Sequence, residues 1–239
     1  MAKIEVSENC VLGDNLVYIQ NCLGEIFNHA DCTIKNTVIN ERTKLSVTCP
    51  EYYADIIRAE IADKIAEIVA IKYKYDFFKK NLKIGGLSSE EKEILLVSLI
   101  AADFEDDKKY CFDRFKGYRE IAVDGMYNFR LQPLKRKWKE VVEYMPCCFF
   151  KEQLKDFIFY LNENRKKKVY IDCGKVYDGH FRRLKRHSLM EYDKLNVLRE
   201  VILSNCGVIE ISGPIPKQDE NYLREYYGDK IIFSTGYFS

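Results

Sequence analysis

Residues 123–145, VDGMYNFRLQPLKRKWKEVVEYM, carry in close succession the signals of a turn, a strand and a helix. Asp124-Gly125 is a dipeptide typical of turns, and the run over residues 126–131 predicts a short strand. Pro133 suits the first turn of a helix. That helix places four apolar side chains on one face: Leu134, Trp138, Val141 and Met145. The stretch therefore predicts a fold that mixes strands and helices, with the tryptophan in the core.

Residues 1–49, which precede Pro50, predict a small N-terminal α+β element. Apolar residues alternate with polar ones in three places, which indicates short strands: Ile4 and Val6, Ile34 and Val38, and Leu45 and Val47. Asn40-Glu41-Arg42 suits a hairpin turn between the second and third strands. Residues 15–29 have helical spacing, although Gly24 weakens that prediction.

Residues 50–166 predict a central helical body. Four isoleucines recur every three to four residues along its first helix: Ile57, Ile61, Ile65 and Ile68. Ser88 and Glu91 form a capping-box pattern before a helix that extends to about Phe115. Residues 94–100 are apolar around nearly the whole circumference of this helix, so we expect it at the centre of the core.

Residues 167–239 predict a C-terminal βαβ-like mixed sheet. Val169, Ile171 and Cys173 alternate as in a strand, and Asp178-Gly179 suits a turn. Helices near residues 192–205 and 219–227 each precede a short apolar run. Strand, helix, strand at this spacing favours parallel pairing. The predicted fold class is therefore α+β, in three segments: 1–49, 50–166 and 167–239.

The composition of the 239 residues is that of a globular protein, with 47% hydrophobic and 31% charged residues and a net charge of +1. The first ten residues lack the basic start and apolar core of a signal peptide. No apolar run approaches the roughly 20 residues that a spanning helix needs. We expect a cytoplasmic protein with no membrane partner and with its nine cysteines reduced.

No motif in the chain indicates a catalytic residue, a metal site or a cofactor. The cysteines lack the paired spacing of zinc ligands, the three histidines lie far apart, and the nucleophile-elbow and phosphate-loop motifs are absent. One acidic group lacks the calcium-loop pattern, and we interpret it as a solvated helix flank: Asp103, Glu105, Asp106 and Asp107. We predict none of these sites, although an enzyme of unrecognised class stays open.

Basic residues interleaved with aromatic ones are the strongest functional signal in the sequence. The first-choice contact region for phosphate or a partner is residues 165–187, where the basic side chains surround Tyr170, Tyr177 and Phe181. Its predicted contacts are Arg182, Arg183, Lys185 and Arg186. The second choice is the helix face that carries Lys135 and Lys139. Runs of this kind are also common on solvated faces, and the sequence pI near 7.5 is low for a nucleic-acid-binding domain.

The order of motifs around the opening stretch resembles the YtxC-like family, putative sporulation proteins of endospore-forming bacteria. The resemblance rests on Asp124-Gly125, residues 129–131, Trp138 and residues 141–143. It continues through Phe150, Gln153, Phe157 and Ile158 and then more loosely to residues 231–236, which resemble the family's closing strand. It covers residues 87–236 and implies no catalytic residue.

These observations together predict an accessory protein that acts by binding a partner protein. Nucleic-acid binding through residues 165–187 is the alternative, and catalysis is a further one. The setting in sporulation comes from the resemblance alone.

Overall fold

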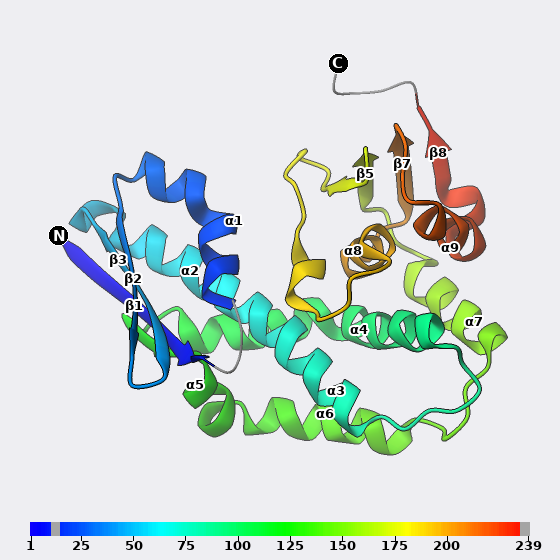
Figure 1. Ribbon diagram of the computed structural model, residues 1–239, viewed down its shortest axis with the longest axis horizontal. Helices are drawn as coiled ribbons and strands as arrows, with labels where there is room; N and C mark the ends of the chain where they lie inside the picture. The colour runs from blue at the N-terminus through cyan, green and yellow to red at the C-terminus, as the bar shows by residue number, and fades with distance from the viewer. Residues whose placement is uncertain (11–14, 235–239) are drawn as a thin grey trace. The chain divides into compact units, whose positions relative to one another are not determined.

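The computed structural model describes residues 1–10 and 15–234, and its fold is α+β, as predicted (Figure 1). The chain forms two compact units. Unit 1 comprises Met1–Lys74 and Glu105–Glu143, and unit 2 comprises Tyr75–Phe104 and Tyr144–Ser239. The three segments expected from the sequence do not coincide with these units, because the helical residues 50–166 are shared between both.

Unit 1 is built on a four-stranded sheet of order β2-β3-β1-β4. The strands are β1 (Ala2–Asn9), β2 (Thr33–Ile39), β3 (Arg42–Cys49) and β4 (Glu120–Ala122). β1 and β2 run antiparallel to β3, whereas β4 runs parallel to β1. The hairpin turn lies where it was predicted but has two residues, Asn40 and Glu41, both with positive φ, because Arg42 already pairs with Ile39 as the first residue of β3.

Helices α1 (Asn15–His29) and α2 (Ala54–Ile68) pack on one face of this sheet (Figure 1). Alternate residues of β1 and β3 are buried beneath them, among them Ile4, Val6 and Val47. α2 begins after a 3₁₀ turn (Glu51–Tyr53) and continues through a π-helical turn (Val69–Tyr73). The isoleucine stripe predicted from the sequence supplies the buried face of α2.

The predicted strand at residues 126–131 is wrong, because these residues belong largely to helix α5 (Val123–Arg130). The side chains directed inward, Val123, Tyr127 and Leu131, are spaced by four, which is helical spacing. The Tyr127 ring packs against Tyr73 with centroids 4.5 Å apart. Asp124 in the first turn of α5 forms a bidentate ion pair with Arg42 of β3 at 2.6 and 3.0 Å.

Trp138 of α6 (Gln132–Tyr144) is fully buried in unit 1, which confirms its predicted core position. Its indole Nε1 donates a hydrogen bond of 2.9 Å to Asp107, a residue of helix α4 (Ser89–Phe115). Helix α4 is shared by the units: residues 89–104 belong to unit 2 and residues 105–115 to unit 1.

Unit 2 contains the second four-stranded sheet, of order β6-β5-β7-β8. Its strands are β5 (Lys168–Asp172), β6 (Lys175–Tyr177), β7 (Val208–Ser212) and β8 (Ile231–Phe233). β5, β7 and β8 are mutually parallel, as predicted. The β5–β6 hairpin turns at Cys173-Gly174, both with positive φ, and a second reversal follows at residues 178–182. Of the expected closing strand, residues 235 and 236 lie outside the described residues.

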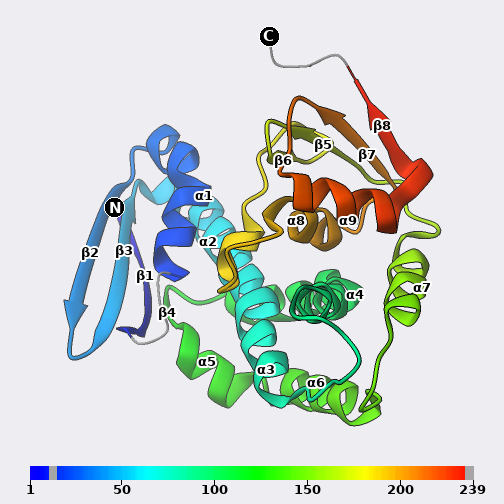
Figure 2. The same cartoon turned by 45° about the vertical axis from the view of Figure 1, so that its right-hand side comes forward.

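The helices of unit 2 are α3 (Lys74–Asn81, from Tyr75 on), the first part of α4, α7 (Lys151–Asn162), α8 (Asn196–Ser204) and α9 (Lys217–Tyr227). Ser88 and Glu91 form the predicted capping box at the start of α4. The crossovers through α8 and α9 step across the sheet in the same direction, so right-handed connections place both helices on one face (Figure 2). Every residue of α8 from Val197 to Ser204 is buried.

We expect replacement of Trp138 by alanine to lower the free energy of unfolding by about 3 to 5 kcal/mol, because the change removes a fully buried indole. Tyr144→Ala is the control, because Tyr144 is 89% exposed on the same helix. Denaturant unfolding followed by circular dichroism measures both. A loss below about 1 kcal/mol for Trp138→Ala would contradict the buried position.

Candidate functional site

The first-choice basic region lies in unit 2, around the β5–β6 hairpin. Tyr170 of β5 and Tyr177 of β6 are cross-strand neighbours, and the Phe181 ring stacks on Tyr170 with centroids 4.5 Å apart. These side chains alternate with the buried Val169 and Ile171, so they lie on the sheet face opposite α8 and α9. Lys168 Nζ lies 4.8 Å above the Tyr170 ring.

The predicted contacts Arg182 and Arg183 are exposed beside this aromatic cluster, and Lys185 is half-buried. Arg182 forms an ion pair of 2.8 Å with Asp178, which also accepts the backbone N–H groups of His180 and Arg182. The loop is therefore organised around one carboxylate, with the two arginines directed to solvent.

Arg186 does not belong to this surface, contrary to our expectation. It is 8% exposed, and its Nε donates to Glu200 of α8 at 2.7 Å. Its other nitrogens bond Leu203 O and Ser204 Oγ. Burial alone would raise the pKa of Glu200, but Arg186 and His187 outweigh it and hold the pKa at about 2. Arg186 is therefore a structural partner of a buried carboxylate.

The second-choice residues Lys135 and Lys139 lie on α6 in unit 1. Lys135 Nζ is 4.5 Å from the Tyr127 ring centroid, a cation–π geometry. Lys139 is 71% exposed and forms an ion pair of 3.4 Å with Glu143 one turn later. An exposed pair of this kind contributes little to stability, and the Tyr127 ring beneath Lys135 is half-buried.

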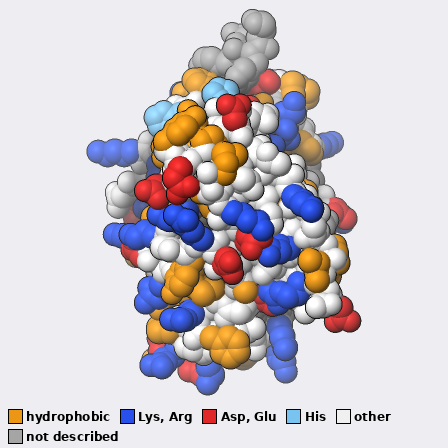
Figure 3. All heavy atoms as spheres, turned by 90° about the vertical axis from the view of Figure 1, so that its left-hand side faces the viewer, with side chains coloured by type: hydrophobic (Ala, Val, Ile, Leu, Met, Phe, Trp, Pro, Cys, Tyr) orange, Lys and Arg blue, Asp and Glu red, His pale blue; other side chains and the backbone are white. Residues whose placement is uncertain are grey.

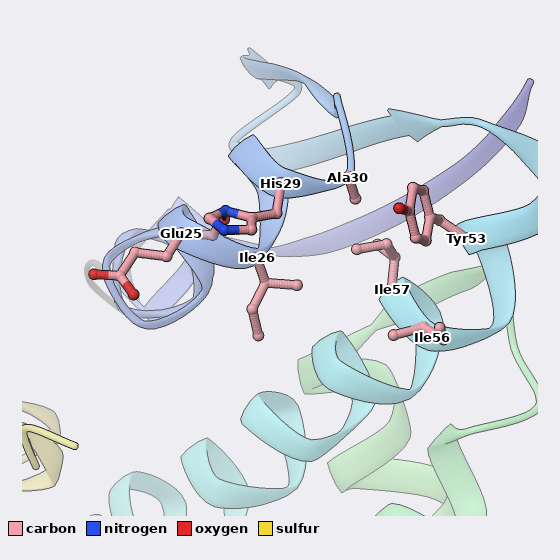
Figure 4. A pocket seen from close by; sticks show the side chains of 7 residues that line it. All are labelled: Glu25, Ile26, His29, Ala30, Tyr53, Ile56 and Ile57. Carbon is pink, nitrogen blue, oxygen red and sulfur yellow. Dashed lines mark hydrogen bonds between the residues drawn. The ribbon is translucent and has the colours of Figure 1, made fainter. Parts of the chain in front are cut away.

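A groove in unit 1 was not anticipated from the sequence. It encloses about 290 Å³ between the last turns of α1 and the start of α2 (Figure 4). Its apolar walls come from Ile26, Ala30, Ile56 and Ile57, and its more polar lining from Glu25, His29 and Tyr53. In Figure 4 the Ile26 and Ile57 side chains point into the space between the two helices, while the Glu25 carboxylate points away from it. Such a groove can accept an apolar side chain.

One of the residues that line this groove is acidic, and two further acidic residues adjoin lining residues in the sequence. Glu25 is a lining residue. Asp31 directly follows the lining residue Ala30 in the sequence, and Asp55 directly precedes the lining residue Ile56. All three are exposed, with Asp55 at 85% and paired to Arg58. His29 Nδ1 lies 3.1 Å from the carbonyl of Glu25. The combination favours a ligand that carries both apolar and basic groups.

The solvent face of the unit 1 sheet presents mixed charges. Lys3 and Lys44 bind Glu5 at 2.6 and 2.8 Å. In Figure 3, Lys and Arg side chains are scattered over the face shown, with acidic side chains between them. On this face, charges of both signs are therefore interspersed.

Glu8 of β1 is a buried carboxyl group of unit 1 with a raised pKa. It is 1% exposed, and its Oε1 accepts hydrogen bonds from Asn15 at 2.7 Å and Tyr73 at 3.0 Å. Among the described residues, Oε2 has no hydrogen-bond partner. Burial raises the pKa of Glu8 to about 7, although these two hydrogen bonds lower it. A perturbed acid can mark a catalytic site, but burial in a structural core raises the pKa of a carboxyl group in the same way, and Glu8 is 1% exposed.

Asp107 corrects our interpretation of the acidic group 103–107 as a solvated flank, because its side chain is buried. Lys74 and Lys137 bind its two oxygens at 2.7 and 2.9 Å, and Trp138 shares one of them. Burial opposes ionisation, but these contacts keep the pKa of Asp107 below its ordinary value. The sequence signal that could have revealed it is its position on the apolar face of α4, three residues after the buried Phe104 and four before Cys111.

Within residues 1–10 and 15–234, no three or more His, Cys, Asp or Glu side chains cluster to hold a metal ion. No helix within those residues is both long enough and apolar enough to cross a membrane.

Comparison with known proteins identified no relative. The chain matched no protein-family model, no curated protein and no solved structure.

Glu8 predicts a specific dependence of stability on pH. Its pKa is about 7 in the folded state and about 4.5 in the unfolded state, so between these values the folded state binds more protons and stability falls as pH rises. Relative to the wild type, Glu8→Gln should gain up to about 3 kcal/mol of unfolding free energy between pH 5 and pH 8.

Denaturant unfolding at several pH values measures this difference, and Glu5→Gln is the control on the same strand. The pKa of Glu5 is lowered to about 2 by Lys3 and Lys44, so Glu5 is ionised in both states above pH 5. The difference between Glu5→Gln and the wild type should therefore stay constant. A constant difference for Glu8→Gln as well would contradict the raised pKa.

Proposed function

We propose that this chain is an accessory protein that acts by binding a partner protein through unit 1. The observation that carries the proposal is the apolar groove between α1 and α2. Ile56 is 55% exposed at its edge, and a helix or loop that inserts an apolar side chain would bury this surface. Burying such a side chain contributes about 1.5 to 3 kcal/mol, enough to anchor a complex.

The charge around the groove defines the chemistry of the partner segment. Glu25, the acidic residue among those that line the groove, favours a basic residue beside the inserted side chain, since opposite charges speed association and fix the orientation. An amphipathic segment with basic and apolar faces has this composition. The resemblance to YtxC-like proteins adds sporulation as the proposed setting and names no partner.

A synthetic amphipathic helical peptide of leucine and lysine tests the groove by fluorescence anisotropy. We expect the wild type to bind the labelled peptide at low salt and more weakly as salt is raised, because exposed charges are screened. Ile56→Ser and Glu25→Lys should each weaken binding by about tenfold, the loss of an apolar contact or a charge interaction.

Val17→Ser is the matched control, because Val17 is a 45% exposed apolar residue of α1 outside the groove. It should bind the peptide like the wild type. Equal affinity of all four proteins, or no binding by the wild type at low salt, would contradict a groove that accepts basic apolar segments.

Nucleic-acid binding through unit 2 is a second candidate, favoured by the aromatic cluster on the open sheet face. Phe181 is 45% exposed over Tyr170, and Arg182 and Arg183 follow it directly. Exposed rings stack with bases, and adjacent arginines contact phosphates. Because Arg182 is paired with Asp178 and the net charge is only +1, this candidate ranks second.

Titration with fluorescent single-stranded DNA and RNA at about 50 and about 150 mM salt tests this candidate. If nucleic acid is the ligand, the double variant Arg182→Glu, Arg183→Glu should abolish binding and Phe181→Ala should weaken it, with melting temperatures preserved. Lys139→Glu on α6 is the control. Arg186 stays unchanged in these variants because its reversal would place two acids together in the core of unit 2. Unaltered affinity of the double variant would exclude this surface.

A further inference from the structure

The edge strand β2 offers a surface that the proposed function does not use. β2 spans seven residues, Thr33–Ile39, and pairs with β3 on one side only. Six of the seven residues are exposed, including Ile34 at 37%, Val38 at 69% and Ile39 at 58%. Proteins usually shorten or cover such edges, or place charges along them, because an open apolar edge pairs with further strands. Lys35 is the one charged residue of β2 that could discourage such pairing.

The hairpin turn determines which backbone groups of β2 point outward. A two-residue turn at Asn40-Glu41 makes Ile39 and Arg42 the closing hydrogen-bonded pair. Hydrogen-bonded and non-bonded pairs then alternate along an antiparallel ladder. Ile34, Asn36 and Val38 therefore turn their N–H and C=O groups away from β3. The N–H of Cys32 agrees with this alternation, since it bonds Phe27 O at 2.9 Å.

The sequence of β2 is complementary to itself in the antiparallel direction. If a second copy pairs symmetrically about Asn36, Ile34 lies opposite Val38 of that copy, and Val38 opposite its Ile34. These are the residues whose backbone groups point outward, so each of the three pairs can exchange two hydrogen bonds. Lys35 lies opposite Thr37, which keeps like charges out of direct opposition.

We propose that β2 pairs antiparallel with β2 of a second copy of this chain, centred on Asn36. The unit 1 sheets of the two copies then form one continuous sheet. The interface is isologous, because both copies use the same strand. The pairing buries a single strand edge, so it belongs to the small interfaces typical of weak association. The fraction of chains in dimers therefore rises with protein concentration, whether or not the groove binds a partner.

Sedimentation velocity of the full chain from about 5 to about 300 µM tests the pairing by mass action. We expect the wild type to shift from monomer towards dimer over this range. Ile34→Glu alone and Val38→Lys alone should each stay monomeric, because a charge then faces an apolar residue. An equimolar mixture of the two variants should associate again, because the new acid of one chain faces the new base of the other.

Ile39→Lys is the matched control, because it charges an exposed apolar residue of the same strand outside the Ile34–Val38 pairs. It should dimerise within about threefold of the wild type. Melting temperatures of all variants establish that they fold. A wild type that stays monomeric throughout, a mixture that does not associate, or a Val38→Lys variant that dimerises like the wild type would each overturn the proposal.

Discussion

The packing of unit 1 depends on the buried contacts of the Asp107 carboxylate. It is buried and ionised, and it joins the start of α3, the second half of α4 and α6 through Lys74, Lys137 and Trp138. Lys74 is itself fully buried. A buried ion pair is worth little compared with an apolar replacement, but removal of one partner leaves an uncompensated charge. The arrangement therefore specifies how these helices pack rather than supplying much net stability.

Unit 2 repeats this use of buried charge with different residues. Glu200 on α8 receives Arg186 and His187, and Glu93 on α4 receives the Tyr75 hydroxyl at 2.9 Å and Arg199 at 3.5 Å. Buried carboxylates in both units therefore have cationic or hydroxyl partners within the same unit. At their surfaces, unit 1 has a groove and an open strand edge, and unit 2 has an aromatic cluster beside two arginines.

The repeating patterns were predictable from the sequence, and the pairings between distant residues were not. The strands of residues 1–49, the capping box at Ser88 and the parallel C-terminal sheet follow from local periodicity and turn chemistry. The basic neighbours of Arg186 in the sequence predict a surface position, whereas Glu200, fourteen residues later, binds it in the core. The groove was missed for a similar reason, since its walls come from two helices whose juxtaposition no local pattern encodes.

The division of the chain between the units has a consequence for synthesis. The chain passes from one unit to the other after residues 74, 104 and 143, so unit 1 consists of two separate segments. Asp107 and Trp138 lie in the second segment, and Lys74 ends the first. Lys74 and its partner Asp107 thus enter unit 1 from different segments, and unit 1 is complete only when residues 105–143 have been synthesised. Folding of unit 1 therefore requires residues 105–143 as well as residues 1–74. Until those residues have been synthesised, the open edge of β2 is exposed to other nascent chains.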